Sequence, residues 1–275
     1  MVSFEKIDYT TDQFVELYDE LPLWSAPFGL LLLEHVPLQS ARRIPDVGAG
    51  TGFLSVELAQ RSMTCVVVAV DPWSAALRRL KSKAERLGLA NICAIESSIE
   101  DVDLEPESFD LVVSNLGINN FSEPLAAIRK CSQVLKKGGH FVLCTNTRGH
   151  MAEFYNAYCV VLQHLGLVQE RMSLERHIDH RVDETSLSML LESGGFAVTN
   201  IYRDSFSMRF AGGTALFRHH LIRSAFLPSW AEICPPDQRV KVFTALEQRF
   251  NVLAQAQGDL SLSVPMLCVQ AINRT

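Results

Sequence analysis

The chain has 275 residues, of which 48% are hydrophobic and 20% charged, so it can bury a sizeable core as one large domain or as a core with a moderate cap. Its 25 Lys and Arg residues against 31 Asp and Glu residues give a formal charge of −6, which excludes a whole-chain basic field for nucleic acid. No apolar run approaches the roughly 20 residues of a membrane span, so we expect no membrane partner.

The N-terminus and the cysteines both favour a cytoplasmic protein. Charged side chains at Glu5, Lys6, Asp8 and Asp12 predict that the chain starts without a signal peptide. The seven cysteines are scattered and include no C-x-x-C pair. We therefore expect reduced, mostly buried thiols.

Two helices are predicted before the first strand. Apolar residues recur at helical spacing over residues 14–21, and a second apolar stretch covers residues 28–36. We expect residues 1–40 to form an N-terminal helical cap. Tyr18 and Trp24 are its candidate substrate contacts, although the same side chains would also serve to pack the cap.

A glycine-rich turn follows the first predicted strand. After Ile44 the chain continues Pro45-Asp46-Val47-Gly48-Ala49-Gly50-Thr51-Gly52-Phe53-Leu54, which is typical of a strand, a turn and the start of a helix. Glycines are needed where φ is positive or where a ligand lies against bare main chain. Phe53 stands where the dinucleotide fingerprint needs a small residue, and no Lys follows Gly52 as in a phosphate loop. The G-x-G-x-G spacing predicts a different nucleotide-like ligand at this turn.

Strands and helices then alternate along the chain. Strands are predicted at residues 64–70, 92–95, 109–114 and 140–145, with helix-length segments between them. Ser122 is the expected cap of a helix that has Pro124 in its first turn and runs to Gly138-Gly139. This alternation predicts an α/β fold, a parallel sheet with helices on both faces.

The pattern loosens twice after the fifth strand, where helical segments are too long to be simple connections. The expected organisation is a cap at 1–40, core at 41–147, helical insertion at 148–182, core at 183–210, helical cap insertion at 211–260 and a last core strand at 261–275. A strand is predicted at 196–203, with a possible extension to residue 210. The two insertions are expected to add to the helical cap of the sheet.

An acidic residue ends the second predicted strand. Asp71 can accept both hydroxyl hydrogens of a ribose, or it can cap a helix that opens at Pro72, and the two roles are compatible. Trp73 offers a flat surface for a purine or fills the seam between helix and sheet. The carboxylate and the glycine turn together predict one nucleotide-like site.

In the order of its motifs, the chain resembles the class I S-adenosylmethionine (SAM) methyltransferases. The resemblance covers residues 44–145 and the closing strands, and includes the glycine turn, Val70-Asp71, the strand at 109–115 and the turn Leu135-Lys136-Lys137-Gly138-Gly139. It looks most like the small-molecule type, similar to quinone-biosynthesis methyltransferases.

The resemblance implies SAM as cofactor and a Rossmann-like, mostly parallel sheet of seven strands. The last strand, at 264–272, would be antiparallel and lie beside 196–203. The implied cofactor contacts are Asp46, Gly48, Ala49, Gly50, Gly52, Asp71, Pro72, Trp73, Ser98, Ile99 and Asn115. Ser98 departs from the family, which commonly has at this place an Asp that holds the adenine amino group.

The acceptor side is less defined. Candidate bases are His150, His219 and His220, and candidate acceptor contacts are Asn119, Asn120 and Arg218. Each could instead be a turn, packed or solvated residue. No metal is expected, because the chain contains no H-E-x-x-H motif and the His177 and His180 pair lacks further ligands nearby.

We therefore expect a SAM-dependent methyltransferase that acts on a small-molecule acceptor by in-line displacement under a helical lid, as a monomer or homodimer. A non-catalytic SAM-binding protein, another enzyme class on the same fold, and a methyltransferase for protein or nucleic acid are the alternatives. The tetrapeptide Ser114-Asn115-Leu116-Gly117 differs from the N-P-P-Y/F type associated with amino-group methylation in nucleic acid or protein, which disfavours the last of these.

Overall fold

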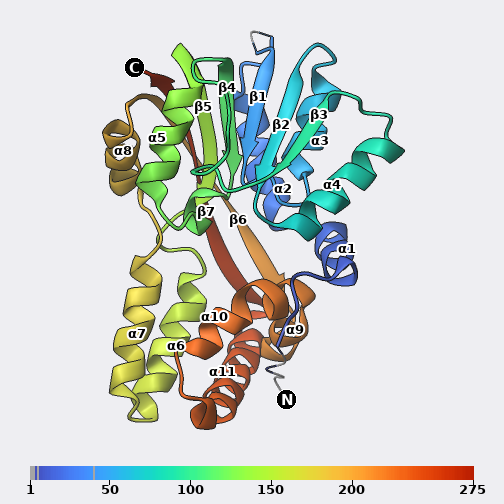
Figure 1. Ribbon diagram of the computed structural model, residues 1–275. Helices are drawn as coiled ribbons and strands as arrows, with labels where there is room; N and C mark the ends of the chain where they lie inside the picture. Colours follow the sequence, from blue (N-terminus) through green and yellow to red (C-terminus); the bar gives the residue numbers. More distant parts are fainter. Residues whose placement is uncertain (1–3, 5, 40) are drawn as a thin grey trace. The chain divides into compact units, whose positions relative to one another are not determined.

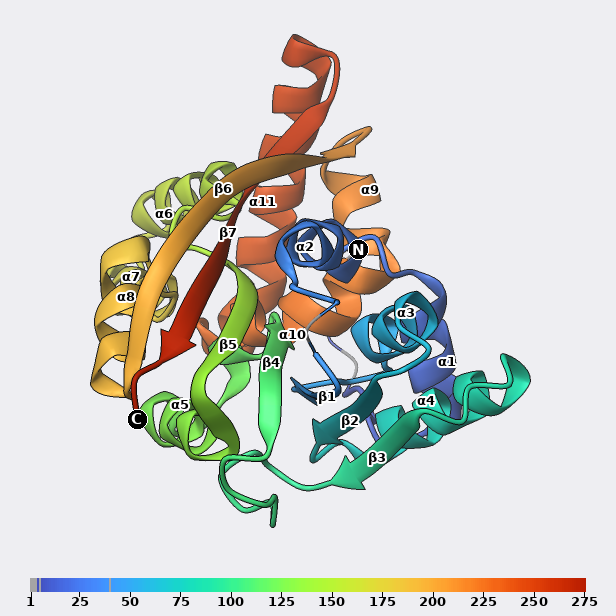
Figure 2. The same ribbon diagram turned by 90° about the horizontal axis from the view of Figure 1, so that it is seen from above.

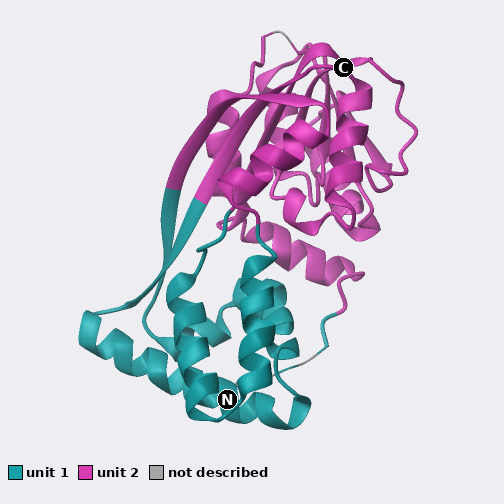
Figure 3. Ribbon diagram, turned by 90° about the vertical axis from the view of Figure 1, so that its left-hand side faces the viewer, with its two compact units in different colours: residues 1–7, 147–181, 205–265 teal, residues 8–146, 182–204, 266–275 magenta. Residues whose placement is uncertain are grey.

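The computed structural model describes residues 4, 6–39 and 41–275; residues 1–3, 5 and 40, near the ends of the expected N-terminal cap, lie outside the described residues. The chain forms two compact units (Figure 3). The core unit comprises residues 8–146, 182–204 and 266–275, and the inserted unit comprises residues 1–7, 147–181 and 205–265. Within the described ranges, no helix combines the length and the apolar character needed to cross a membrane.

A seven-stranded sheet contains the strands in the order β3-β2-β1-β4-β5-β7-β6 (Figures 1 and 2). The strands are β1 Arg43–Val47, β2 Val66–Asp71, β3 Ile92–Glu96, β4 Phe109–Asn115, β5 Leu135–Asn146, β6 Phe196–Phe210 and β7 Leu260–Asn273. The pairs among β1 to β5 are parallel, and β7 pairs with β5 in antiparallel register, with Cys144 opposite Cys268. The predicted Rossmann-like sheet with an antiparallel last strand beside β6 is confirmed.

Helices cover both faces of the core sheet, as the alternation predicts. In β2, Val68 and Val70 belong to an apolar cluster with residues of α5 (Pro124–Val134) and α8 (Glu184–Ser193). Ala69, which points to the opposite face, packs instead with α3 (Phe53–Arg61) and α4 (Ser74–Arg86). A strand apolar on both sides fits this double cover.

Two helices precede β1 in the core unit, α1 (Asp12–Glu20) and α2 (Ser25–His35). The Thr11 hydroxyl caps α1 by accepting the Phe14 N–H at 3.3 Å. On α2, a Cβ added to Gly29 would lie 2.4 Å from Cε1 of Phe53, so this helix approaches the start of α3 closely.

Two predicted features of the helix before β5 were wrong. Glu123, not Ser122, holds the cap position of α5, and no side chain caps the helix there. α5 ends at Val134 and does not reach Gly138-Gly139, because the chain from Leu135 onward is already extended in β5.

The inserted unit is mainly helical. Its helices are α6 Ala152–His164, α7 Val168–Asp179, α9 Gly213–Arg218, η2 Ile222–Phe226, α10 Leu227–Glu232 and α11 Pro236–Gln257. The Phe154 ring stacks on Trp230 with 3.8 Å between centroids and on Phe250 with 5.5 Å. The buried rings of α6, α10 and α11 therefore form an aromatic core for this unit.

Candidate functional site

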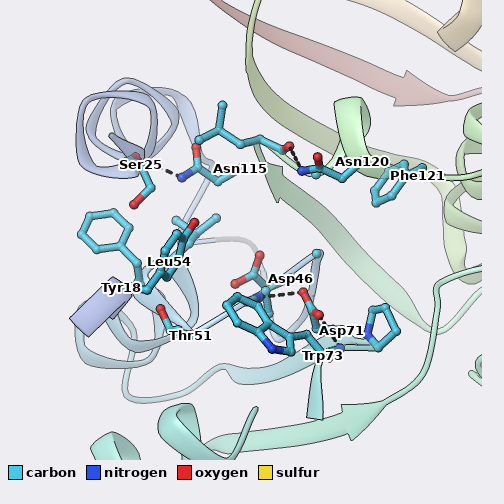
Figure 4. A pocket seen from close by; sticks show the side chains of 17 residues that line it. Tyr18, Ser25, Asp46, Thr51, Leu54, Asp71, Trp73, Asn115, Asn120 and Phe121 are labelled. Carbon is cyan, nitrogen blue, oxygen red and sulfur yellow. Dashed lines mark hydrogen bonds between the residues drawn. The ribbon is translucent and has the colours of Figure 1, made fainter. Parts of the chain in front are cut away.

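A cavity of about 270 Å³ lies in the core unit, where β1, β2 and β4 end (Figure 4). In parallel sheets of this kind, ligands bind outside the carboxyl ends of the strands. The cavity is lined by Tyr18, Ser25, Asp46, Gly48, Ala49, Gly50, Thr51, Phe53, Leu54, Asp71, Pro72, Trp73, Asn115, Leu116, Gly117, Asn120 and Phe121. The site is thus formed by three stretches at strand ends, within residues 46–54, 71–73 and 115–121, together with Tyr18 and Ser25 from the helices before β1.

The glycine turn between β1 and α3 holds its shape by main-chain bonds. The Gly48 and Ala49 N–H groups donate to the Val70 carbonyl at 2.9 and 3.2 Å. Gly52 has φ +81°, and an added Cβ would lie 2.1 Å from Cδ1 of Leu80, so this glycine is required by packing. Gly50 has φ +52°, yet an added Cβ would meet nothing within 4 Å. Gly50 therefore leaves open space where a ligand can lie against the backbone.

Asp71 joins this turn to the start of α4. Its Oδ2 accepts the Gly50 N–H at 2.8 Å and its Oδ1 accepts the Trp73 N–H at 2.8 Å. Burial raises the pKa of Asp71, and the two N–H donors oppose that effect. Because each carboxylate oxygen has a second lone pair, both can still accept a ribose hydroxyl.

A second carboxyl, Asp46, lies at the end of β1 with 1% of its surface exposed. Its Oδ2 accepts the Ser55 hydroxyl at 2.6 Å. Burial raises the pKa of Asp46 from 3.8 to about 7, the Ser55 hydrogen bond opposes this, and the charge of Asp71 adds to it. The two carboxyls make the site attractive to a cation.

Asn115, at the end of β4, faces the same cavity (Figure 4). Its Nδ2 donates to the Ser25 carbonyl of α2 at 3.1 Å. Its Oδ1 is buried and has no hydrogen-bond partner within the described part of the chain. A buried acceptor without a partner is costly unless a ligand donates to it.

Helix α1 brings Tyr18 to the cavity wall beside Trp73, with 5.6 Å between the ring centroids. The Trp73 indole donates to the Tyr9 carbonyl at 2.7 Å. Asp19, with 8% of its side chain exposed, fastens α1 to α4 through Arg79 at 2.8 Å and Lys83 at 2.6 Å. The N-terminal segment is thus part of the site.

Residues 38–195, more than half of the chain, match the methyltransferase domain family. The chain belongs to this methyltransferase family. The malonyl-[acyl-carrier protein] O-methyltransferase of Priestia megaterium is 29% identical over 124 residues, covering 45% of this chain and 44% of that protein. The tRNA1(Val) (adenine(37)-N6)-methyltransferase of Aeromonas hydrophila is 31% identical over 128 residues, covering 44% and 53%. The methyltransferase thus spans about half the length of these curated relatives.

A solved structure shares the fold. The phosphoethanolamine N-methyltransferase 2 of Haemonchus contortus, in complex with phosphomonomethylethanolamine and S-adenosylhomocysteine, aligns with a TM-score of 0.59 at 15% identity, over 100% of this chain and 61% of that chain. Together with the family match, the sheet order identifies a class I SAM-dependent methyltransferase fold, for which SAM is the cofactor.

The cavity of this methyltransferase fits SAM in three respects. Open space faces Gly50, where a Cβ would lie if the residue were larger. Asp71 retains free lone pairs for a ribose, and the partnerless Asn115 Oδ1 can accept from an N–H donor. The two carboxyls match the positive charges of a sulfonium and an ammonium group.

Five predicted contacts in the core unit do not line the described cavity: Gly52, Ser98, Ile99, Trp24 and Asn119. The Ser98 hydroxyl donates to Asp101 at 2.8 Å, and Ile99 is buried in the apolar core. The Trp24 ring lies 5.6 Å from Phe28, and the Asn119 amide donates to Thr145 and Asn146. Their roles in binding stay predictions.

Several lining residues were missed by the sequence reasoning. Thr51, Phe53 and Leu54 are in the glycine stretch itself, and Leu116 and Gly117 directly follow Asn115, so adjacency to a motif was the available signal. Phe121, after η1 (Ile118–Asn120), likewise follows the candidate residue Asn120. Ser25 gave no such signal, because α2 reaches the cavity only through the fold.

The histidines proposed as bases belong to the inserted unit, as does Arg218 at the end of α9. Burial, followed by the charges of Arg181 and His177, lowers the pKa of His150 to about 3, so its imidazole is neutral and weakly basic. Burial also lowers the pKa of His219, with a smaller contribution from His220. Over residues 4, 6–39 and 41–275, no group of three or more His, Cys, Asp or Glu side chains is arranged to hold a metal ion.

Proposed function

We propose that this methyltransferase transfers a methyl group from SAM to a small-molecule acceptor. The observation that carries the proposal is the meeting of Gly50, Asp71 and Asn115 at one cavity of the core unit. When bound, SAM supplies a methyl group on a sulfonium sulfur, which is an activated leaving group.

The chain's own contribution is to bind and orient. Asp71 would accept from the ribose hydroxyls, the open main chain at Gly50 would lie against the cofactor, and Asn115 Oδ1 would accept from its ammonium group.

Among the cavity-lining residues, the titratable side chains are Tyr18, Asp46 and Asp71. Burial, and then the charge of Asp71, raises the pKa of Tyr18, so its phenol stays protonated and is a poor base at neutral pH. Positioning and exclusion of water therefore supply the rate enhancement, which can amount to several kcal/mol.

Two observations support a small acceptor. Tyr18 of α1 and Ser25 of α2 contribute to the cavity wall, which narrows the space left for a macromolecule. The charge of −6 offers no general attraction for a polyanion. We also propose a cytoplasmic monomer or homodimer, which gel filtration and cell fractionation test.

Isothermal titration of the full chain with SAM and with S-adenosylhomocysteine tests the cofactor. We expect saturable binding of both and a flat titration with NAD(H). No heat with either sulfur compound at high micromolar concentration would overturn the proposal.

An assay of S-adenosylhomocysteine release tests the acceptor class, with phenols, small carboxylic acids, small amines, a malonyl-loaded carrier protein and tRNA as acceptors. Release with a free small molecule supports the proposal. Release only with tRNA or the carrier protein contradicts the small-acceptor part, and tight SAM binding without release in any arm indicates a non-catalytic SAM-binding protein.

A further inference from the structure

A second polar site lies inside the inserted unit, centred on the Tyr155 hydroxyl. The Trp230 indole donates to this oxygen at 3.2 Å, His177 Nε2 lies 3.3 Å from it, and His150 Nε2 lies 3.4 Å from it. Tyr155 is 5% exposed, whereas the His177 side chain reaches the surface of the unit in part. We call Tyr155, His150, His177, Trp230 and Arg181 the Tyr155 cluster.

Arg181 follows α7 and supplies the charge of this cluster. Its side chain is half-buried, and burial lowers the pKa of its guanidinium, while the nearby Tyr155 opposes that effect. The same charge acts on His150 and His177, where it adds to burial in lowering both pKa values. The Arg181 main-chain N–H donates to the Ile178 carbonyl at 3.3 Å, so the chain still turns as at the end of a helix there. Arg181 follows His177 by four residues, which places the two side chains next to each other on this turn.

Several arginines of the chain form ion pairs with carboxylates, and within the described part of the chain Arg181 does not. Arg79, Arg203 and Arg209 are each paired with a carboxylate. No Asp or Glu of the described residues forms an ion pair or hydrogen bond with Arg181. A half-buried cation without a counter-ion is unfavourable in the folded protein, and a bound anion reduces that cost.

The remaining members of the cluster are neutral at pH 7. Burial lowers the pKa of both histidines, that of His150 to about 3, and burial raises the pKa of the Tyr155 phenol. Neutral imidazole and phenol groups can each donate one hydrogen bond. The cluster thus presents one fixed positive charge next to neutral donors.

We propose that Arg181, His177 and Tyr155 bind the carboxylate of a small organic acid. The planar guanidinium fork matches a carboxylate in a two-point contact, and the single charge matches a monoanion better than a phosphate monoester. Because all five members belong to one unit, the inference concerns binding there and does not depend on the methyl-transfer function.

Titration of the full chain with benzoate at constant ionic strength, followed by calorimetry, tests the inference. We expect a dissociation constant on the order of 1 mM, as for a fragment held by one charged contact. Benzamide, which has the same shape without the charge, should bind at least about tenfold more weakly, and phenyl phosphate should bind more weakly than benzoate. Equal binding of benzoate and benzamide overturns the proposal, and preference for phenyl phosphate overturns the assignment to carboxylates.

Arg181→Gln should weaken benzoate binding at least about tenfold. The matched control is Arg176→Gln in α7, since Arg176 is exposed and contacts Ser173 at 3.0 Å. It should leave benzoate binding unchanged. If Arg176→Gln and Arg181→Gln weaken binding equally, the effect is one of net charge and the proposal fails.

A thermal melt separates binding from folding. Arg181→Gln removes no ion pair, so its melting temperature should equal or exceed that of the wild type. If the variant unfolds instead, Tyr155→Phe provides the second test: it keeps the ring, removes the hydroxyl and should weaken benzoate binding several-fold. Unchanged benzoate binding in Tyr155→Phe contradicts the proposal. Absence of SAM binding by the wild-type protein would contradict the proposed function and would leave the carboxylate site untouched.

Discussion

The two polar sites of the molecule carry opposite charge. The cavity of the core unit is lined by two carboxyls, Asp46 and Asp71, whereas the Tyr155 cluster of the inserted unit holds one arginine among neutral rings. The cofactor of the fold carries a sulfonium and an ammonium group, which suit the first site. An organic acid suits the second.

The sites also differ in how the cost of burying charge is offset. Asp71 receives two backbone N–H groups at 2.8 Å, so the protein itself stabilises this carboxylate before any ligand arrives. Arg181 receives no comparable bond from the described residues. A preformed site and a site completed by its ligand are expected to respond differently to mutation.

The largest expected effect on cofactor affinity is at Asp71. Asp71→Ala removes the ribose acceptor and leaves the Gly50 and Trp73 N–H groups unpaired, so the loop loses its shape. Hydrogen bonds to a charged group are worth about 1.5–3 kcal/mol each, and SAM affinity should fall roughly 100-fold or more. Calorimetry measures the affinity. Asp71→Asn keeps one acceptor oxygen, so its affinity for SAM should lie between those of the wild type and Asp71→Ala. An effect below about threefold would show that the carboxylate does not contact the cofactor.

Asp46 should make stability depend on pH. Its pKa rises from 3.8 to about 7 on folding, so its proton stabilises the folded state below pH 4, and that contribution is lost as the pH rises to 7. At about 1.36 kcal/mol per pKa unit, the loss is on the order of 4 kcal/mol. Urea unfolding between pH 4 and 8 measures it.

The control for Asp46 is the variant Asp46→Asn. Other carboxyls such as Asp19 and Asp110, whose pKa values are lowered, also make stability depend on pH, but they contribute equally to both proteins. The difference in free energy of unfolding between the two should change steadily over this range in favour of the variant. A difference that is constant with pH contradicts the raised pKa.

The two sites differ as well in how far the sequence predicts them. The core site is built from residues at or just after the ends of β1, β2 and β4, and these ends meet at one edge of a parallel sheet. Gly50 and Asp71 could therefore be brought together from local patterns, whereas Asp46 and Asn115 were implied by the family resemblance. The alternation of strands and helices likewise predicted a parallel sheet with helices on both faces, whereas the antiparallel last strand was implied by the family resemblance.

The Tyr155 cluster could not be predicted in this way. Its members come from the segment before α6, from α6, α7, the segment after α7, and α10, and no single local motif relates their spacing in the chain. His150 was singled out only as an isolated candidate base, and His177 was considered only for metal binding. The packing of aromatic helices, which assembles the cluster, has no short-range sequence signal.

A smaller effect is expected where α1 is fastened to α4. Asp19→Asn leaves Arg79 and Lys83, with 17% and 21% of their side chains exposed, without their shared carboxylate. The loss should be about 2 kcal/mol in unfolding free energy, less than for a fully buried pair. Asp12→Asn is the matched control on the same helix: its pair with Arg78 is exposed, 70% and 53%, and should be worth about 0.5 kcal/mol. Equal losses in urea melts would mean that burial does not distinguish the two pairs.

The smallest expected effect separates backbone strain from ligand contact. Gly50 and Gly88 both have positive φ, +52° and +66°, and a Cβ added to either meets nothing within 4 Å. Gly50→Ala and Gly88→Ala should therefore each cost about 1 kcal/mol of stability, because an alanine is strained in this region. Only Gly50 lines the cavity, so only Gly50→Ala should weaken SAM binding, by roughly tenfold or about 1.4 kcal/mol. Calorimetry measures the SAM affinity of the two variants, which carry a similar backbone strain, one in the cavity wall and one outside it. If Gly50→Ala and Gly88→Ala lose SAM affinity equally, the space beside Gly50 does not hold the cofactor. The glycine turn would then be a structural turn and not a surface against which the cofactor lies.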